Sequence, residues 1–343
     1  MSLRRRRLLS ILALAPALAA LSRLPLAQAA GERFLRIGTG PIGGSYFPIG
    51  GLIANVISSP PGSMTCGPRG GCGVPGVIAA AVASPGSVAN LLDLASRTVD
   101  LAISQADVAR DAYTAAGPFA SKPPLVQLRA IASLFGEALH LVTRRDNGIA
   151  SVADLARRRV SLGERNSGTL ATVRVVLHAY NLKESALIAS YDSLVRAAGA
   201  LANGSIDAFF MVGGYPLDAV THLTDTLPLA LVPIAGERAA SITASSSTLR
   251  PLTIPEGTYP GIGAIATLGP RAQLLTTSAM DDDLAFAITT ALWDPRNRPV
   301  LDGGSALGRE IRLARALEGL IIPLHVGAFR YYWQSGMKPS GER

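Results

Sequence analysis

The 343-residue chain is short of the side chains from which most catalytic and metal sites are built. It contains two cysteines and four histidines, and charged residues make up 16% of it. The cysteines have no nearby histidine and lack the C-x-x-C spacing of a zinc site. The histidines form no H-E-x-x-H motif, and no G-x-S-x-G nucleophile elbow is present. We therefore expect no catalytic residues, no metal and no cofactor.

Long hydrophobic runs are equally scarce, and the one at the N-terminus has the features of an export signal. Four arginines at positions 4–7 precede an apolar run over residues 8–21, and "LPLAQAAGE" then offers an A-x-A cleavage site. The run is too short to span a membrane comfortably. It predicts a signal peptide over residues 1–30, removed on export to the periplasm. The "RRxLL" pattern leaves both the Sec and the twin-arginine routes open.

Removal of that segment on export changes the expected net charge of the mature protein and the expected state of its cysteines. The formal net charge of +8 falls to about +3, because the first 30 residues hold five arginines and no acid. No cluster of basic residues interleaved with aromatic ones remains, so we expect no nucleic-acid partner. In an oxidising compartment, Cys66 and Cys72 are predicted to form a small structural disulfide across the flexible "GPRGG" segment.

The order of the predicted elements indicates an α/β protein with two lobes. The chain is longer than one hydrophobic core usually serves. Alternating strand and helix patterns predict mostly parallel sheets covered by helices. Strands near 139–145 and 264–277 are expected to pass between the lobes at a hinge. The expected boundaries are residues 31–137 plus 278–343 for lobe I and 138–277 for lobe II.

Glycine-rich and hydroxyl-rich loops follow several of the predicted strands. The first contains G-x-G-x-x-G, but no Asp or Glu occurs from Arg33 through Leu92, which excludes the ribose-binding acid of a dinucleotide site. Each loop alone is better explained as a helix cap or a turn. Together they predict a ligand cleft at the carboxyl ends of the strands. The loops are "GTGPIGGSYF", "SPGSVAN", "SQAD", "ERNSGT" and "VGGYP".

The ordered motifs resemble one known family. "IGTGPIGGSYFPIGGLIANVIS", "VDLAISQADVARDAY", "SLGERNSGT", "NGSIDAFFMVGGYP" and "IPLHVGAFRYYWQSG" are similar to segments of TAXI-family solute-binding proteins of tripartite ATP-independent periplasmic (TRAP) transporters. The resemblance implies a type II periplasmic binding protein, with two α/β lobes around a hinge and a ligand cleft between them. It also implies a monomeric receptor, not an enzyme, that delivers a glutamate-, glutamine- or 2-oxoglutarate-like ligand to a TRAP permease.

The resemblance implies a set of ligand-binding positions. They are Thr39, Ser45, Tyr46, Gln105, Asn166, Ser167, Gly168, Thr169, Phe210, Gly213, Gly214 and Pro216. Arg165 is a candidate second anchor for a carboxylate, with a solvated loop charge as the alternative. Ile42 stands where the family commonly has threonine, which removes one hydrogen bond to a glutamate-like ligand.

Three other functions stay open at this point. The first is a binding protein of an ATP-driven importer, and the second is a sensory receptor. The third is an exported hydrolase that uses Ser167 with a histidine.

Overall fold

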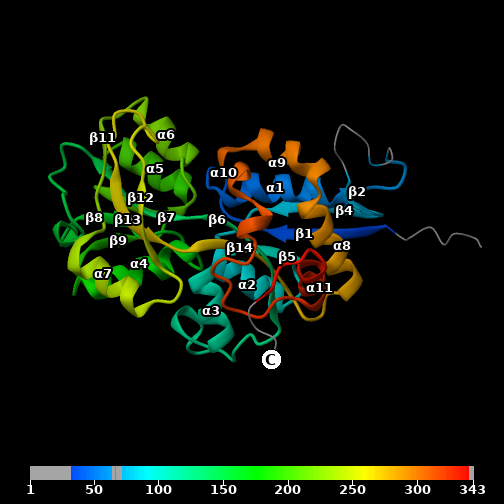
Figure 1. The fold of residues 1–343 in the computed structure, drawn as a ribbon. Helices are drawn as coiled ribbons and strands as arrows, with labels where there is room; N and C mark the ends of the chain where they lie inside the picture. The colour runs from blue at the N-terminus through cyan, green and yellow to red at the C-terminus, as the bar shows by residue number, and fades with distance from the viewer. Residues whose placement is uncertain (1–31, 64–65, 67–71, 340–343) are drawn as a thin grey trace, which may run out of the picture. The chain divides into compact units, whose positions relative to one another are not determined.

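The computed structural model describes residues 32–63, 66 and 72–339. The expected signal peptide over residues 1–30 lies outside the described residues. The described elements are arranged around two five-stranded sheets (Figure 1). Among these elements, no helix combines the length and the apolar character that crossing a bilayer requires.

The first sheet has the strand order β4-β1-β5-β14-β6. Its strands are β1 (Arg33–Gly38), β4 (Val77–Val82), β5 (Leu101–Gln105), β6 (Leu128–Gly136) and β14 (Arg271–Thr277). Strand β1 is parallel to β4 and β5, whereas β14 is antiparallel to β5 and β6. All five residues of β5 are buried, as expected for a strand at the centre of a sheet with both faces covered.

Helices cover both faces of this sheet (Figure 1). One face packs against α1 (Tyr46–Ile57), α8 (Asp282–Trp293), α9 (Arg298–Gly304), α10 (Ala306–Glu310) and α11 (Val326–Gln334). The other face packs against α2 (Ser87–Ala95) and α3 (Ala106–Thr114). The apolar sides of the helices and of the strands thus form a core on each side of the sheet.

The second sheet has the strand order β11-β7-β10-β8-β9. Its strands are β7 (Ala138–Arg144), β8 (Arg159–Ser161), β9 (Ile188–Ser190), β10 (Ala208–Gly213) and β11 (Leu229–Leu231). Strand β7 is antiparallel to β10 and β11, and β8 is parallel to β9 and β10. Helices α4 (Gly168–Ala179) and α7 (Gly236–Ser245) cover one face, and α5 (Leu194–Ala202) and α6 (Asp218–Thr224) cover the other.

Both sheets are mixed, but in each of them four strands run in one direction and one strand, β14 or β7, runs against them, so most of the strands are parallel as expected. The antiparallel pairs occur where the chain passes from one sheet to the other without an intervening helix. Strand β14 enters the first sheet from the second lobe and therefore runs against β5 and β6. A helical crossover, which would make neighbouring strands parallel, is missing at that point.

The sequence pattern over 264–277, predicted as one return strand, forms two strands. Pro270 separates β13 (Ile265–Gly269) from β14, and β13 pairs with β12 (Arg250–Ile254). Because β14 is hydrogen-bonded within the first sheet, we propose to move the expected lobe boundary from 277 to 269. Lobe II is then residues 138–269, and lobe I is the rest of the described chain.

The remaining elements are short. Strands β2 (Ser58–Ser59) and β3 (Val74–Pro75) form a parallel pair. Single 3-10 turns are found at Gly117–Phe119, Val152–Leu155, Glu184–Ala186, Pro295–Asn297 and Leu313–Arg315.

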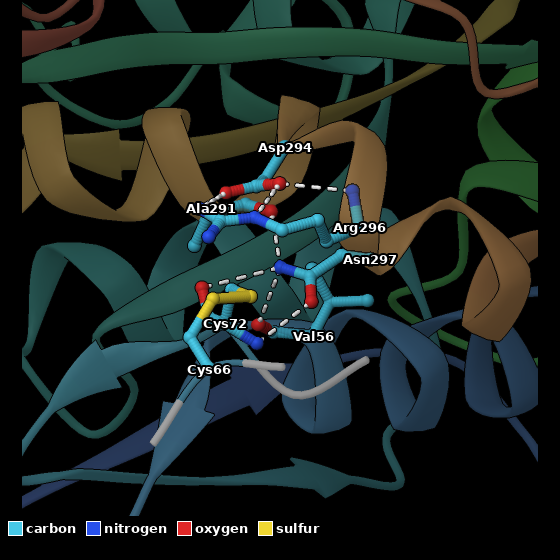
Figure 2. Close-up of a disulfide and its surroundings, with 7 residues drawn as sticks. All are labelled: Val56, Cys66, Cys72, Ala291, Asp294, Arg296 and Asn297. Atoms are coloured by element: carbon cyan, nitrogen blue, oxygen red, sulfur yellow. Dashed lines mark hydrogen bonds and ion pairs between the residues drawn. A yellow bond between two sulfur atoms is a disulfide. The ribbon is translucent and has the colours of Figure 1, made fainter. Parts of the chain in front are cut away.

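The predicted disulfide between Cys66 and Cys72 is present. Figure 2 shows that it lies beside Asn297, a fully buried side chain. Asn297 Oδ1 accepts a hydrogen bond from the Cys72 N–H at 2.9 Å, and its Nδ2 donates to the Ala291 carbonyl at 2.8 Å. One amide thus ties the disulfide loop to the C-terminal end of α8.

Candidate functional site

A cavity lies between the two lobes, where loops at the carboxyl ends of strands meet. Its volume is about 30 Å³, and about 520 Å³ of space between atoms surrounds this, part of it open solvent. Lobe I contributes the β1–α1 loop, the β4–α2 loop and the end of β5. Lobe II contributes the β8–α4 loop, the start of α5 and strand β10. The polar lining residues are Ser45, Tyr46, Ser87, Gln105, Glu164, Ser167, Thr169 and Asp192.

The sequence-predicted positions divide into two groups. Those that line the cavity are Ser45, Tyr46, Gln105, Ser167, Gly168, Thr169 and Phe210. Those outside its lining are Thr39, Asn166, Gly213, Gly214 and Pro216. We propose ligand contacts for the first group only.

The outlying positions have structural contacts of their own. Thr39 is fully buried, and its hydroxyl donates to the Val82 carbonyl at 2.7 Å. The Asn166 carbonyl accepts from the Ala89 N–H at 3.0 Å, a contact between the lobes. The Gly214 N–H donates to Ser45 Oγ at 3.2 Å, a second such contact. These residues support the cavity from behind or from its edge.

The candidate anchor Arg165 is exposed and does not line the cavity. Its guanidinium carbon lies 4.0 Å from the centroid of the Tyr191 ring. This is the geometry of a cation–π contact at the surface. The position agrees with the alternative interpretation of Arg165 as a loop charge, so we do not propose it as an anchor.

Helix N-termini give the cavity its electrostatic character. Helices α1, α2 and α4 begin at Tyr46, Ser87 and Gly168, and all three residues belong to the lining. The first N–H groups of a helix have no partner within it, and the helix dipole places partial positive charge there. Such termini favour a carboxylate or another anionic group.

Two hydroxyl groups add hydrogen-bond donors. Ser45 Oγ accepts from the Gly214 N–H at 3.2 Å, and Ser167 Oγ, the N-cap of α4, accepts from the Leu170 N–H at 3.1 Å. Neither hydroxyl donates a hydrogen bond to another residue within the described part of the chain. Each therefore retains its proton for an acceptor in the cavity.

A buried amide fixes the first loop. Asn90 Nδ2 donates to the Thr39 carbonyl at 2.6 Å and to the Ile103 carbonyl at 2.7 Å. Its side chain is fully buried on α2. It thus connects the β1–α1 loop to β5, which holds the loop in place beside the cavity.

The lobe II side of the cavity also carries acidic groups. Glu164 and Asp192 belong to the lining, and no Arg or Lys does among the residues that the structure describes. Asp192 Oδ2 accepts from the Ser190 hydroxyl at 2.6 Å. Glu164 and Ser87 lie in loops that the sequence singled out, whereas Asp192 follows the short strand β9 and had no recognisable sequence signal.

A polar chain behind the lining joins the lobes. Gln105 Nε2 donates to Thr172 Oγ1 at 3.0 Å, and that hydroxyl lies 3.0 Å from Asp107 Oδ2, to which it donates. Burial raises the pKa of Asp107 to about 6, against the hydrogen bond from Thr172, which lowers it. The lobes are therefore in contact in this structure through buried polar groups.

The histidines lie away from this cavity. His140 Nε2 lies 3.0 Å from the Tyr259 hydroxyl, and burial lowers its pKa to about 4, which keeps the ring neutral. His325 caps α11 by accepting the Gly327 N–H at 3.1 Å. No described histidine lines the cavity. Within the same described ranges, no group of three His, Cys, Asp or Glu side chains is arranged to hold a metal ion.

Comparison with known proteins identifies the family. A model of the NMT1-like family matches residues 37–336. The chain belongs to the NMT1-like family. This family is broader than the resemblance stated from the motifs, and membership of the TAXI family stays a prediction.

Solved structures share the fold of this NMT1-like protein. A protein of Bordetella bronchiseptica is 16% identical, with a TM-score of 0.50 over 90% of this chain and 91% of that one. An alkanesulfonate-binding protein, SsuA of Xanthomonas axonopodis pv. citri bound to MOPS, is 15% identical, with a TM-score of 0.44 over 91% and 82%. The predicted α/β fold with two lobes is confirmed. At these identities the likeness concerns the fold alone.

Proposed function

We propose that the protein is a periplasmic solute-binding receptor that captures a small organic acid or amino acid between its lobes. This proposal rests on the composition of the cavity. Three helix N-termini and the hydroxyl protons of Ser45 and Ser167 converge there on space for a small acceptor group. Ligand contacts to both lobes shift the population toward the closed arrangement.

The acidic lining narrows the ligand class. Glu164 and Asp192 repel a second carboxylate and attract an ammonium group, and the Arg196 guanidinium, 3.6 Å from Asp192, offsets part of the Asp192 charge. Glutamine, with one carboxylate and one ammonium group, therefore fits this lining best. Glutamate fits it better than 2-oxoglutarate, because its ammonium group is attracted while both of these carry a second carboxylate. The carboxylate of the amino acid would lie against the helix N-termini and its ammonium group toward lobe II.

A binding role fits the cavity better than a hydrolytic one. The Ser167 hydroxyl caps α4, and the described histidines that could serve as a base lie elsewhere. A nucleophilic serine needs a base within hydrogen-bond reach. We therefore propose no enzymatic activity.

We propose that the receptor delivers its ligand to a TRAP permease. The alternatives are an ATP-driven importer and a sensory partner. Uptake of labelled ligand by cells that make the receptor with its permease separates them. Collapse of the ion gradient stops TRAP-driven uptake, whereas depletion of ATP at a maintained gradient stops an ATP-driven importer. A sensory receptor supports no uptake.

The ligand proposal is tested by thermal shift and calorimetry. L-glutamate, L-glutamine, 2-oxoglutarate, L-arginine and D-glucose serve as probes, because a ligand that binds only the folded state raises the melting temperature. We expect stabilisation by an amino acid and weaker or no effect of 2-oxoglutarate. Stabilisation by glucose alone would contradict the proposal.

A matched pair of variants locates the ammonium group. Asp192→Asn removes the lining charge and should weaken amino-acid binding about tenfold, while Asp225→Asn, at an exposed position outside the lining, should leave it unchanged. Stronger binding of 2-oxoglutarate than of glutamate to the unmodified protein would favour an organic acid instead.

A further inference from the structure

Glu137 lies at the point where the chain crosses between the lobes. It is the single residue between β6 of the first sheet and β7 of the second. Its N–H donates to the Pro270 carbonyl at 3.0 Å, on the other crossing segment. A Cβ on Gly269 would collide with the Glu137 carbonyl oxygen. The two crossing segments thus touch backbone to backbone at this residue.

The side chain of Glu137 connects this crossing to the cavity. It is 1% exposed, and its Oε2 accepts a hydrogen bond from the Tyr46 hydroxyl at 2.8 Å. Its other oxygen, Oε1, is buried without a hydrogen-bond partner among the described residues. Tyr46 is the first residue of α1 and lines the cavity, and its ring packs edge-on against Phe135 of β6. The proposed function gives this buried carboxyl no role.

We propose that Glu137 is a positioning residue of the ligand site, whose neutral carboxyl holds the Tyr46 hydroxyl and permits the lobes to close. The proposed role in closure rests on the burial of this carboxyl and on its hydrogen bond to Tyr46, and the direction of its pH dependence rests on the charge state of the carboxyl. The expected pH effect on ligand affinity rests in addition on the proposed function, namely that the ligand has a carboxylate. The ionised form would place a buried charge at the crossing, with only one hydrogen bond to compensate it. It would also repel a ligand carboxylate that contacts Tyr46.

The surroundings of the carboxyl favour its neutral form. Burial raises the pKa of Glu137 to about 8, the hydrogen bond from Tyr46 lowers it, Asp107 on α3 raises it, and Arg271 on β14 lowers it. The neighbours of the carboxyl, Tyr46, Asp107 and Arg271, all lie in lobe I, and the proposal holds that water reaches the crossing beside them when the lobes separate, so that the pKa falls toward its ordinary value. Closure therefore takes up a proton at neutral pH.

The direction of the pH effect on closure follows from this uptake of a proton. Where the closed form binds a proton that the open form lacks, a rise in pH favours the open form, by up to tenfold per pH unit. The pKa of Asp107 is about 6, so its own contribution is largely complete below pH 7. Between pH 7 and pH 9 the change reports on Glu137. We expect ligand affinity to fall about tenfold over this range.

The first test needs no ligand. Small-angle X-ray scattering of the ligand-free protein at pH 6.5 and pH 9 measures the separation of the lobes. We expect a larger radius of gyration at pH 9 for the unmodified protein and for Glu256→Gln, a change at an exposed site. Glu137→Gln, which is neutral at both pH values, should show no difference. Equal radii for the unmodified protein at the two pH values would overturn the proposal.

The second test measures binding of L-glutamate by calorimetry at pH 7, 8 and 9. The unmodified protein should lose affinity and take up a proton on binding, and Glu137→Gln should do neither. Tyr46→Phe should bind more weakly but keep the pH dependence, because the carboxyl remains. A constant affinity of the unmodified protein would overturn the proposal.

The two experiments also separate this inference from the proposed function. If L-glutamate fails to bind but scattering shows the pH-dependent opening, the ligand proposal has failed and the role of Glu137 in closure stands. If Glu137→Gln does not fold, carboxyl carbon-13 NMR of the unmodified protein measures the titration of Glu137. A midpoint below pH 6 there would overturn the inference.

Discussion

Gly168 lies where the lobes approach too closely for a side chain. It opens α4 in lobe II, and a Cβ at this position would collide with Gln105 Oε1 of lobe I. Gln105 is held there by its hydrogen bond to Thr172, so it cannot move aside without breaking that contact. Two residues of the motif "NSGT" are therefore needed for different reasons. Ser167 supplies the hydroxyl that caps α4, and Gly168 leaves room for Gln105 because it has no side chain.

Gly168→Ala should hinder closure while each lobe stays folded. We expect ligand affinity to fall at least tenfold, equivalent to about 1.4 kcal/mol. Calorimetry with the amino acid found by thermal shift measures the effect. Gly199→Ala is the control, because Gly199 is exposed on α5 and a Cβ there meets no atom within 4 Å. Unchanged affinity of Gly168→Ala would show that the lobes have room at this contact.

At the scale of elements, short sequence patterns predict the structure correctly where the interacting residues are close together in sequence. Ser151 and Asp154, a serine with an acid three residues on, form a capping box. The three acids at 281–283 begin a helix, with Asp281 Oδ1 accepting from the Leu284 N–H at 2.9 Å. Asn297, in contrast, shows no such signal in the sequence, because its partners at Cys72 and Ala291 belong to other elements.

Asn297→Ala should destabilise the first lobe. The change removes the hydrogen bonds to the Cys72 N–H and to the Ala291 carbonyl, which keeps only a longer hydrogen bond of 3.4 Å from the Asp294 N–H. We expect the free energy of unfolding to fall by about 2 kcal/mol, as for other losses of buried hydrogen bonds. Urea unfolding monitored by circular dichroism measures it. Asn203→Ala, at an exposed turn, should cost less than about 1 kcal/mol. Equal effects of the two changes would contradict this account.

At the scale of the whole molecule, buried carboxyls distinguish the folded protein from the unfolded chain. Glu137 and Asp107 have pKa values of about 8 and about 6, raised mainly by burial from 4.5 and 3.8. The folded state therefore binds more protons than the unfolded state, and stability falls as pH rises through these values. His140 has the opposite effect. Its pKa is lowered from 6.5 to about 4 in the folded state, so the stability of the fold rises as the pH increases between those two values.

Above pH 7, Glu137 is the group among these three that still changes its charge. We expect the free energy of unfolding to fall by about 1.4 kcal/mol between pH 7 and pH 9, which lowers the melting temperature by about 3 °C. Calorimetric melting at both pH values measures the change. Glu137→Gln should remove this dependence, and Glu256→Gln should retain it. A melting temperature that rises from pH 7 to pH 9 would contradict the prediction.

The sequence by itself determined the fold class, the disulfide and most of the cavity lining. Hydrophobic periodicity, helix caps and glycine-rich turns are local signals, and the loops that follow parallel strands meet at one edge of a sheet. That rule was sufficient to bring Ser45, Gln105 and Ser167 to one cavity.

Only the tertiary structure decided which residues face that cavity and what lies behind it. Thr39 points into the core and Arg165 lies at the surface, although each neighbours a lining residue in sequence. Asp192 joins the lining and Glu137 reaches Tyr46 from a position 91 residues away. Burial and long-range pairing, which set the charge state of a carboxyl, depend on the packing of both lobes and are not encoded in any short stretch of the chain.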